Sequence, residues 1–186
     1  FVSICTPNFL HYEIAKEFLL AGINVVCEKP LCFSVEEAQE LEALAAAKDL
    51  IFAVTYGYTG NTMVKVAREG KIGKVVTVNA EYAQDWLLDE LDESHAGQDK
   101  NLSVWRTDPK ISGISNCVGD IGTHMENMVH YLTGLKIRRI SATVNKYGHA
   151  LDLNANMLVE YENGVNGAHW CSQVAAGHMN GLKVRI

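Results

Sequence analysis

The sequence lacks the features that mark nucleic-acid-binding and membrane proteins. Sixteen lysine and arginine residues stand against 22 aspartate and glutamate residues, the formal net charge is −6, and the basic residues are scattered. A nucleic-acid-binding surface needs clustered basic side chains, so we expect no nucleic-acid partner. No apolar run approaches the roughly 20 residues of a membrane-spanning helix, and the chain opens without a signal-peptide pattern. We therefore expect no membrane association and a cytoplasmic location.

Cysteine is scarce and shows no pattern of disulfide pairing. The five cysteines are odd in number and widely spaced, which excludes a disulfide framework as the basis of the fold. Cys5, Cys27 and Cys171 stand in apolar, strand-like segments, which is typical of reduced cysteines in a hydrophobic core. Apolar residues make up 48% of the chain, enough for a globular core.

A glycine-rich phosphate loop of the G-x-G-x-x-G type is also missing, although the first third of the chain otherwise has the pattern of an α/β protein. Apolar segments at 2–5, 23–27 and 51–55 predict buried strands, and helices are predicted at 9–21 and 34–48. This alternation is typical of βαβ units and a parallel sheet. A parallel sheet that opens directly on a buried strand leads us to expect that its first units precede this chain.

Two of the predicted helix starts carry capping signals. Asn8 is placed to cap the first helix, which Gly22 then ends. Ser34, followed three residues later by Glu37, forms the pattern of a capping box for the second helix.

The pattern changes after Tyr56. Alternation of apolar and polar residues from 76 to 82 predicts a half-buried antiparallel strand, and the polar stretch from 86 to 119 has little periodicity. Further helices are predicted at 61–69 and 120–132, the second ended by Gly134, and further strands at 137–146, 155–161, 165–174 and 182–186, with a hairpin turn at 162–164. We predict an α/β part followed by an α+β part.

The first candidate for chemistry is Lys29. The apolar run that ends at Cys27 is followed by Glu28, Lys29 and Pro30, and ligands of open α/β sheets gather at the carboxyl ends of the strands. Pro30 fixes its own backbone and restricts that of Lys29, so the direction of the lysine side chain is set by covalent geometry. The alternative is a surface turn that closes the strand.

The second candidate is the pair Asp120 and His124. Four residues apart on a helix, the two side chains would share one face. An aspartate can bind a substrate hydroxyl, and a histidine can accept the proton that an alcohol loses on oxidation. The alternatives are that Asp120 caps the helix while His124 is structural, or that Cys117, Asp120 and His124 bind a metal, although a zinc site normally needs more support.

Two further positions are candidates for ligand contact. His11 lies near the start of the first predicted helix, where backbone N–H groups favour anions or ribose hydroxyls, and its alternative is a capping or solvent-facing histidine. Trp105 and Arg106 offer an apolar wall beside a fork of donors suited to phosphate or carboxylate, or they anchor the long loop.

The order and spacing of these motifs resemble the Gfo/Idh/MocA oxidoreductases. The resemblance rests on Thr6-Pro7-Asn8 with His11, on Glu28-Lys29-Pro30, and on Asp120 and His124 in a D-x-G-x-H pattern. Residues 80–86, 105–109 and 172–175 also resemble one sugar-dehydrogenase-like branch, so that the similarity covers essentially the whole chain. The sequence departs from the family in lacking the first strand, the glycine-rich loop and the ribose-binding acidic residue.

The resemblance implies a partial Rossmann domain at 1–57 that binds NAD or NADP, and a domain at 58–186 with a large open, mainly antiparallel sheet flanked by helices. It implies that this sheet mediates a homo-oligomer, a dimer or a tetramer. The implied catalytic residues are Lys29 for charge on the reacting oxygen, His124 as general base and Asp120 for substrate. The implied cofactor contacts are Thr6, Pro7, Asn8, His11, Glu28, Lys29, Pro30, Trp105 and Arg106.

Two rival functions stay open beside a dehydrogenase of a sugar, cyclitol or related polyol. The first is a non-catalytic module whose sheet dimerises or binds a partner, which the missing glycine-rich loop favours. The second is a metal-dependent hydrolase that uses Cys117, Asp120 and His124. The sequence does not distinguish NAD from NADP, because the residue that makes this choice normally follows the second strand of the complete fold.

Overall fold

The computed structural model describes residues 1–61, 64–65, 68–69, 73–91 and 104–186. The chain divides into two compact units. The first unit combines Phe1–Tyr56 with Val104–Ile114, and the second combines Gly57–Ser103 with Ser115–Ile186. The described part of the chain contains no helix long and apolar enough to cross a membrane.

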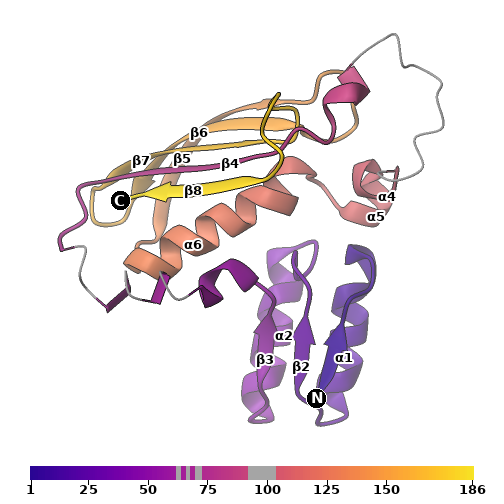
Figure 1. The fold of residues 1–186 in the computed structure, drawn as a ribbon. Coiled ribbons are helices and arrows are strands. Elements are labelled where there is room, and N and C mark those ends of the chain that lie inside the picture. The colour runs from indigo at the N-terminus through magenta and orange to yellow at the C-terminus, as the bar shows by residue number, and fades with distance from the viewer. Residues whose placement is uncertain (62–63, 66–67, 70–72, 92–103) are drawn as a thin grey trace. The chain divides into compact units, whose positions relative to one another are not determined.

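The first unit is built on a parallel sheet of three strands in the order β1-β2-β3. The strands are β1 (Val2–Ile4), β2 (Val25–Cys27) and β3 (Phe52–Val54), joined by the helices α1 (His11–Leu20) and α2 (Val35–Ala47). Both helices lie against the sheet (Figure 1), and the core between them is made of small and aliphatic side chains such as Ala15, Leu19 and Leu41. This confirms the predicted α/β part.

The two predicted capping signals have opposite outcomes. The capping box of α2 is confirmed, because Ser34 Oγ accepts from the backbone N–H of Glu37 while the Glu37 carboxylate accepts from the N–H of Ser34. The cap at Asn8 is wrong. A single 3₁₀ turn, η1 (Asn8–Leu10), precedes α1, and the Asn8 side chain donates instead to the carbonyl of Ser112, at 3.2 Å.

A distant segment completes the first unit. It contains the short helices α4 (Val104–Thr107) and α5 (Pro109–Ser112), the second capped by Asp108, whose carboxylate accepts from the N–H of Lys110. Gly113 follows with a φ of +97°, and a Cβ there would lie 2.9 Å from the Phe33 ring. Glycine therefore allows the segment to pack closely on the loop after β2.

The second unit is a five-stranded mixed sheet with the order β5-β6-β7-β4-β8. Its strands are β4 (Thr77–Ala83), β5 (Ile137–Asn145), β6 (Asn154–Tyr161), β7 (Asn166–Ser172) and β8 (Gly181–Arg185). Helix α6 (Thr123–Thr133) packs along one face of the sheet (Figure 1). Two short 3₁₀ helices, η2 (Gly57–Gly60) and η4 (Leu88–Leu91), lie in the connections.

The alternation predicted for β4 is confirmed, because Val78, Ala80 and Tyr82 are buried in the core beneath α6. The expected antiparallel pairing holds on one side only, since β4 pairs antiparallel with β8 but parallel with β7. Gly134 ends α6 with a left-handed backbone, as predicted. The predicted helix at 61–69 and the polar stretch at 86–119 lie partly outside the described residues.

The cysteine prediction is correct at two of three positions. Cys27 and Cys171 are buried, and burial raises the pKa of the Cys27 thiol to about 12. Cys5 is exposed, so its assignment to the core is wrong. It lies just beyond the end of β1, where the chain has already left the sheet.

Candidate functional site

The first group of candidate residues lies at the carboxyl edge of the parallel sheet. Ile4 of β1 pairs with Cys27 of β2, and the N–H of Glu28 donates to the carbonyl of Ile4 at 2.9 Å. The segments 6–8 and 28–30 therefore leave the sheet at the same edge. The peptide bond between Lys29 and Pro30 is cis. The structure thus brings together all the cofactor-side candidates of the first 30 residues.

The side chain of His11 lies between these two segments and contacts the backbone of both. Its ring is fully buried, and its Nδ1 and Nε2 lie 2.9 and 2.8 Å from the carbonyl oxygens of Pro30 and Thr6. Both alternatives considered for this residue, a helix cap and a solvent-facing side chain, are therefore wrong. The ring nitrogens of His11 thus face the backbone of the two candidate segments, and its contribution to cofactor binding stays a prediction.

Two hydroxyl groups at this edge have no hydrogen-bond partner among the described residues. They are the Oγ1 atoms of Thr6, just after β1, and of Thr55, just after β3. A buried hydroxyl without a partner costs free energy, so such groups in a native fold call for an explanation. A polar ligand lying across the carboxyl ends of the strands would supply the missing partners.

Trp105 and Arg106 lie on α4, in the segment that packs with the parallel sheet. The Arg106 guanidinium carbon is 5.0 Å from the centre of the Trp105 ring, and Trp105 is 40% exposed. The Trp105 carbonyl accepts from the Ser112 hydroxyl at 2.8 Å, and the Ser112 carbonyl accepts from Asn8. Hydrogen bonds through Ser112 therefore connect the Trp105–Arg106 pair to the segment at residues 6–8. This connection is compatible with binding of a ligand by the pair and also with anchoring of the long loop.

The second group of candidates lies in the sheet unit, around Asp120. This residue is in a π-helical turn, η6 (Val118–Gly122), which leads directly into α6. The Asp120 carboxylate accepts a hydrogen bond from Nε2 of the fully buried Gln173, at 2.9 Å. Single π-helical turns occur often at functional sites. Because the turn is wound more widely than an α-helix, the predicted four-residue spacing to His124 does not describe a simple α-helical face.

His124, at the start of α6, lies among aromatic rings. Its ring centre is 4.9 Å from that of Tyr58, nearly perpendicular at 79°, and 6.2 Å from that of Tyr82. The two tyrosine hydroxyls are 2.7 Å apart. Tyr82 also interacts electrostatically with Asp120, so this residue is a shared neighbour of the carboxylate and the imidazole.

The alternatives for these residues can be tested in part. Asp120 does not cap the helix; the Asp152 carboxylate does, accepting from the N–H groups of Asn116 and Val118 at 2.8 and 2.7 Å. Cys117 is a fully buried free thiol, and its hydrogen bond to Cys171 together with burial raises the pKa of the Cys117 thiol. Within the part of the chain that the structure describes, no three histidine, cysteine or acidic residues are grouped so that they could hold a metal.

Sequence reasoning missed several polar residues near the site. Asp152 stands in a turn before β6 and has no recognisable spacing to the helix that it caps. Tyr58 and Tyr82 read as ordinary aromatic residues, and only the tertiary structure brings their hydroxyls together. His169, which stands in no recognisable motif, forms a hydrogen bond between its Nε2 and the Tyr161 hydroxyl, 2.9 Å apart. None of these pairs has a sequence signal, because each joins different elements.

Comparison with known proteins gives a family match over nearly the whole chain. Residues 1–56 match the oxidoreductase family with an NAD-binding Rossmann fold. Residues 61–186 match the GFO/IDH/MocA C-terminal domain.

Individual relatives agree with this. The chain is 39% identical, over its full length, to 48% of the uncharacterized oxidoreductase YfiI of Bacillus subtilis. Over 72% of its length it is 36% identical to 33% of the levoglucosan dehydrogenase of Pseudarthrobacter phenanthrenivorans. The crystal structure of an inositol dehydrogenase homolog of Azotobacter vinelandii, complexed with NAD+, superposes with a TM-score of 0.87 at 36% identity, covering 99% of this chain and 48% of that one. The chain thus spans about half the length, or less, of these relatives.

Proposed function

Because the chain belongs to the Gfo/Idh/MocA family of oxidoreductases, we propose that it is part of an NAD(P)-dependent dehydrogenase of a sugar, cyclitol or related polyol. The observation that carries the proposal is the Asp120 carboxylate, fixed by Gln173 in a π-helical turn that leads directly to His124. A fixed acceptor for one hydroxyl and a base for another are what polyol oxidation needs. The names of the levoglucosan and inositol dehydrogenases support this substrate class.

The described residues fit the nicotinamide end of a dinucleotide. The two hydroxyls of Thr6 and Thr55, buried without partners, lie at the carboxyl edge of a parallel sheet, where such ligands bind. His11 holds the two segments that follow β1 and β2, so that Thr6 and Lys29 have a fixed backbone. We propose that Pro7, Asn8, Glu28, Pro30, Trp105 and Arg106 complete the contacts. A family relative with bound NAD+ supports the choice of cofactor.

In the proposed reaction a bound nicotinamide, held by residues such as Thr6, Asn8 and Lys29, would supply the hydride acceptor for the carbinol carbon of the substrate. His124 accepts the proton of the hydroxyl on that carbon, so that loss of hydride and proton together leaves a carbonyl. The ammonium group of Lys29 stabilises the negative charge that develops on the oxygen. Asp120, held by Gln173, accepts a hydrogen bond from a neighbouring hydroxyl and orients the sugar ring.

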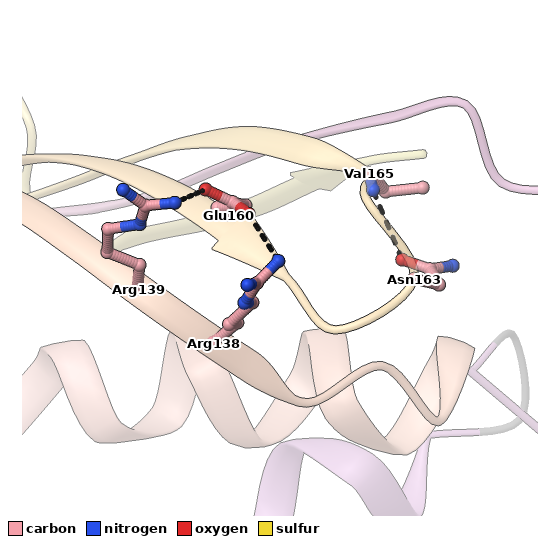
Figure 2. A network of polar contacts seen from close by, with 5 residues as sticks. All are labelled: Arg138, Arg139, Glu160, Asn163 and Val165. Atoms are coloured by element: carbon pink, nitrogen blue, oxygen red, sulfur yellow. Dashed lines mark hydrogen bonds and ion pairs between the residues drawn. The ribbon is translucent and has the colours of Figure 1, made fainter.

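We also propose that the open face of the mixed sheet joins copies of this protein into a homo-oligomer. On this face, opposite α6, the Leu158 side chain of β6 is 68% exposed and lies beside Ser141 of β5. At its β5–β6 edge a register shift between Ile137 and Arg139 lets two consecutive arginines reach Glu160, at 3.2 and 2.8 Å (Figure 2). Beside it, Asn163 closes the β6–β7 turn by accepting from the N–H of Val165. Analytical ultracentrifugation tests the assembly, and a Leu158→Glu variant should reduce it.

The first experiment is a calorimetric titration of the full-length protein with NAD(H) and NADP(H), followed by a screen of polyols for cofactor reduction. Saturable binding together with polyol-dependent reduction is the expected result. Binding of neither cofactor would overturn the proposal and favour the non-catalytic module. A parallel metal analysis should find no stoichiometric metal, whereas activity lost on chelation would favour the hydrolase.

A further inference from the structure

Tyr58 holds the ring of His124 in the second unit. The two rings meet edge to face, with centres 4.9 Å apart at 79°, which is the arrangement that aromatic pairs prefer. Tyr58 comes from η2, whereas His124 comes from the start of α6, so the contact joins two different elements. A ring contact at this distance restricts the orientations that the His124 ring can adopt.

Burial does not fix Tyr58. The residue is 40% exposed, and its ring lines a cavity of about 520 Å³ together with aliphatic side chains. These aliphatic side chains are Val64, Leu132, Leu182 and Val184. Close packing on all sides is therefore absent around this ring, and a polar contact must set its position.

That contact is the hydroxyl of Tyr82, 2.7 Å from the hydroxyl of Tyr58. Tyr82 is 2% exposed on β4, and burial together with its bond to Tyr58 raises the pKa of its hydroxyl. The Tyr82 hydroxyl is consequently neutral at neutral pH and available for the hydrogen bond to Tyr58. Tyr82 is thus a rigid anchor for the exposed Tyr58.

The anchor is the end of a longer chain of hydrogen bonds. The indole N–H of Trp86 donates to Oε1 of Gln84, and Nε2 of Gln84 donates to Oδ1 of Asn180, both at 2.9 Å. The Asn180 side chain in turn bonds to the Tyr82 hydroxyl. Donors and acceptors alternate along this chain, so each bond strengthens the next.

We infer that Tyr58 is a positioning residue for His124, fixed by the chain of hydrogen bonds from Trp86 through Gln84, Asn180 and Tyr82. This rests on the proposed function, since it assigns a support to the proposed base. It predicts that the orientation of the His124 ring, and with it the rate of proton transfer, depends on residues that touch neither substrate nor cofactor.

The test compares Tyr58→Leu, which removes the ring, with Tyr58→Phe, which removes only the hydroxyl, in the full-length protein. Tyr58→Leu should lower kcat by roughly tenfold or more, with the KM for the cofactor unchanged within about twofold. Tyr58→Phe should lower kcat by about two- to fivefold. Asn180 is two hydrogen bonds away from Tyr58 along the chain described above. The Asn180→Leu variant should therefore also lower kcat. Tyr147→Phe, at an exposed turn, is the control and should match the wild type.

A second measurement does not require activity. The Hε1 NMR signal of His124, assigned by its loss in a His124→Asn variant, should carry a ring-current shift in the wild type. That shift should shrink in Tyr58→Leu and persist in Tyr147→Phe. An unchanged signal and unchanged kcat in Tyr58→Leu would overturn the inference. If the wild type reduces no cofactor while the signal still depends on Tyr58, the proposed function fails and the positioning contact stands.

Discussion

Gln173 and Asp120 form a direct hydrogen bond of 2.9 Å between a fully buried amide and a partly exposed carboxylate. The backbone of Gln173 is held on both sides, since its N–H donates to Leu153 and its carbonyl accepts from Leu87. The amide is therefore a fixed donor, and the Asp120 carboxylate takes its orientation from it.

Removing this donor should impair substrate use. Gln173→Met keeps the side-chain length but removes the amide that donates to the carboxylate, which should lower kcat/KM for the polyol about 10- to 100-fold, the value of one hydrogen bond to a charged group. Steady-state kinetics with varied polyol, and with varied cofactor as the second substrate, measure this. The cofactor KM should not change. Gln39→Met, on the exposed surface of α2, is the matched control.

Lys29 should be essential for turnover rather than for folding. In the full-length enzyme Lys29→Ala should reduce kcat by at least about 100-fold, because the charge on the reacting oxygen loses its preorganised cation. The unfolding midpoint should shift little. Turnover near that of the wild type would refute the role given to this lysine. Lys74→Ala, at an exposed position, controls for loss of positive charge.

The burial of His11 predicts a stability effect. His11→Leu removes the ring N–H that donates to one of the carbonyl oxygens of Thr6 and Pro30, which should lower the free energy of unfolding by about 1–3 kcal/mol. His11→Gln retains one donor group and should lose about half as much. Urea denaturation followed by circular dichroism gives both values. His149→Leu, in the β5–β6 connection, should stay within about 0.5 kcal/mol of the wild type.

Glu126 on α6 predicts a pH dependence of stability. Burial raises the pKa of its carboxyl from 4.5 to about 7, and burial lowers the pKa of the nearby His169 to about 4. His169 is therefore neutral at neutral pH, and at 3.8 Å it gives Glu126 no compensating charge. A raised carboxyl pKa contributes stability below the unfolded pKa that is lost as the pH rises through the folded pKa.

Glu126→Gln removes this titration. The variant should gain about 1–2 kcal/mol relative to the wild type between pH 4.5 and pH 7, a range that allows for the one-third exposure of the side chain. Unfolding curves at half-unit pH steps test this. A stability difference that does not vary with pH would show that the carboxyl is not perturbed. Glu162→Gln, at the exposed β6–β7 turn, is the control.

Local signals predicted the elements well and their long-range contacts poorly. The capping box at Ser34, the glycine stop at Gly134 and the alternation along β4 each depend on residues within a few positions of one another, so that sequence reasoning could find them. The Asn8 cap failed because a carbonyl 104 residues away competes for its side chain. The residues next to Asn8 in the sequence give no sign of this competing acceptor.

In the candidate site, too, local signals identified residues whereas long-range contacts were missed. Lys29, Asp120 and His124 stand in short motifs that can be recognised, and their place at strand and helix ends follows from local patterns. Their supports, Gln173 and Tyr58, come from other elements and meet them only in the folded chain. The π-helical turn at Asp120 was also missed, because α-helical periodicity was assumed throughout.

The return of residues 104–114 to the first unit means that the polypeptide passes between the two units three times. The parallel-sheet unit is therefore discontinuous, and a fragment ending at Tyr56 would lack the Ser112 carbonyl that receives Asn8 and the Gly113 backbone that packs on Phe33. Gene fusions or proteolytic dissections that treat the first 56 residues as self-sufficient would cut through one packed structure.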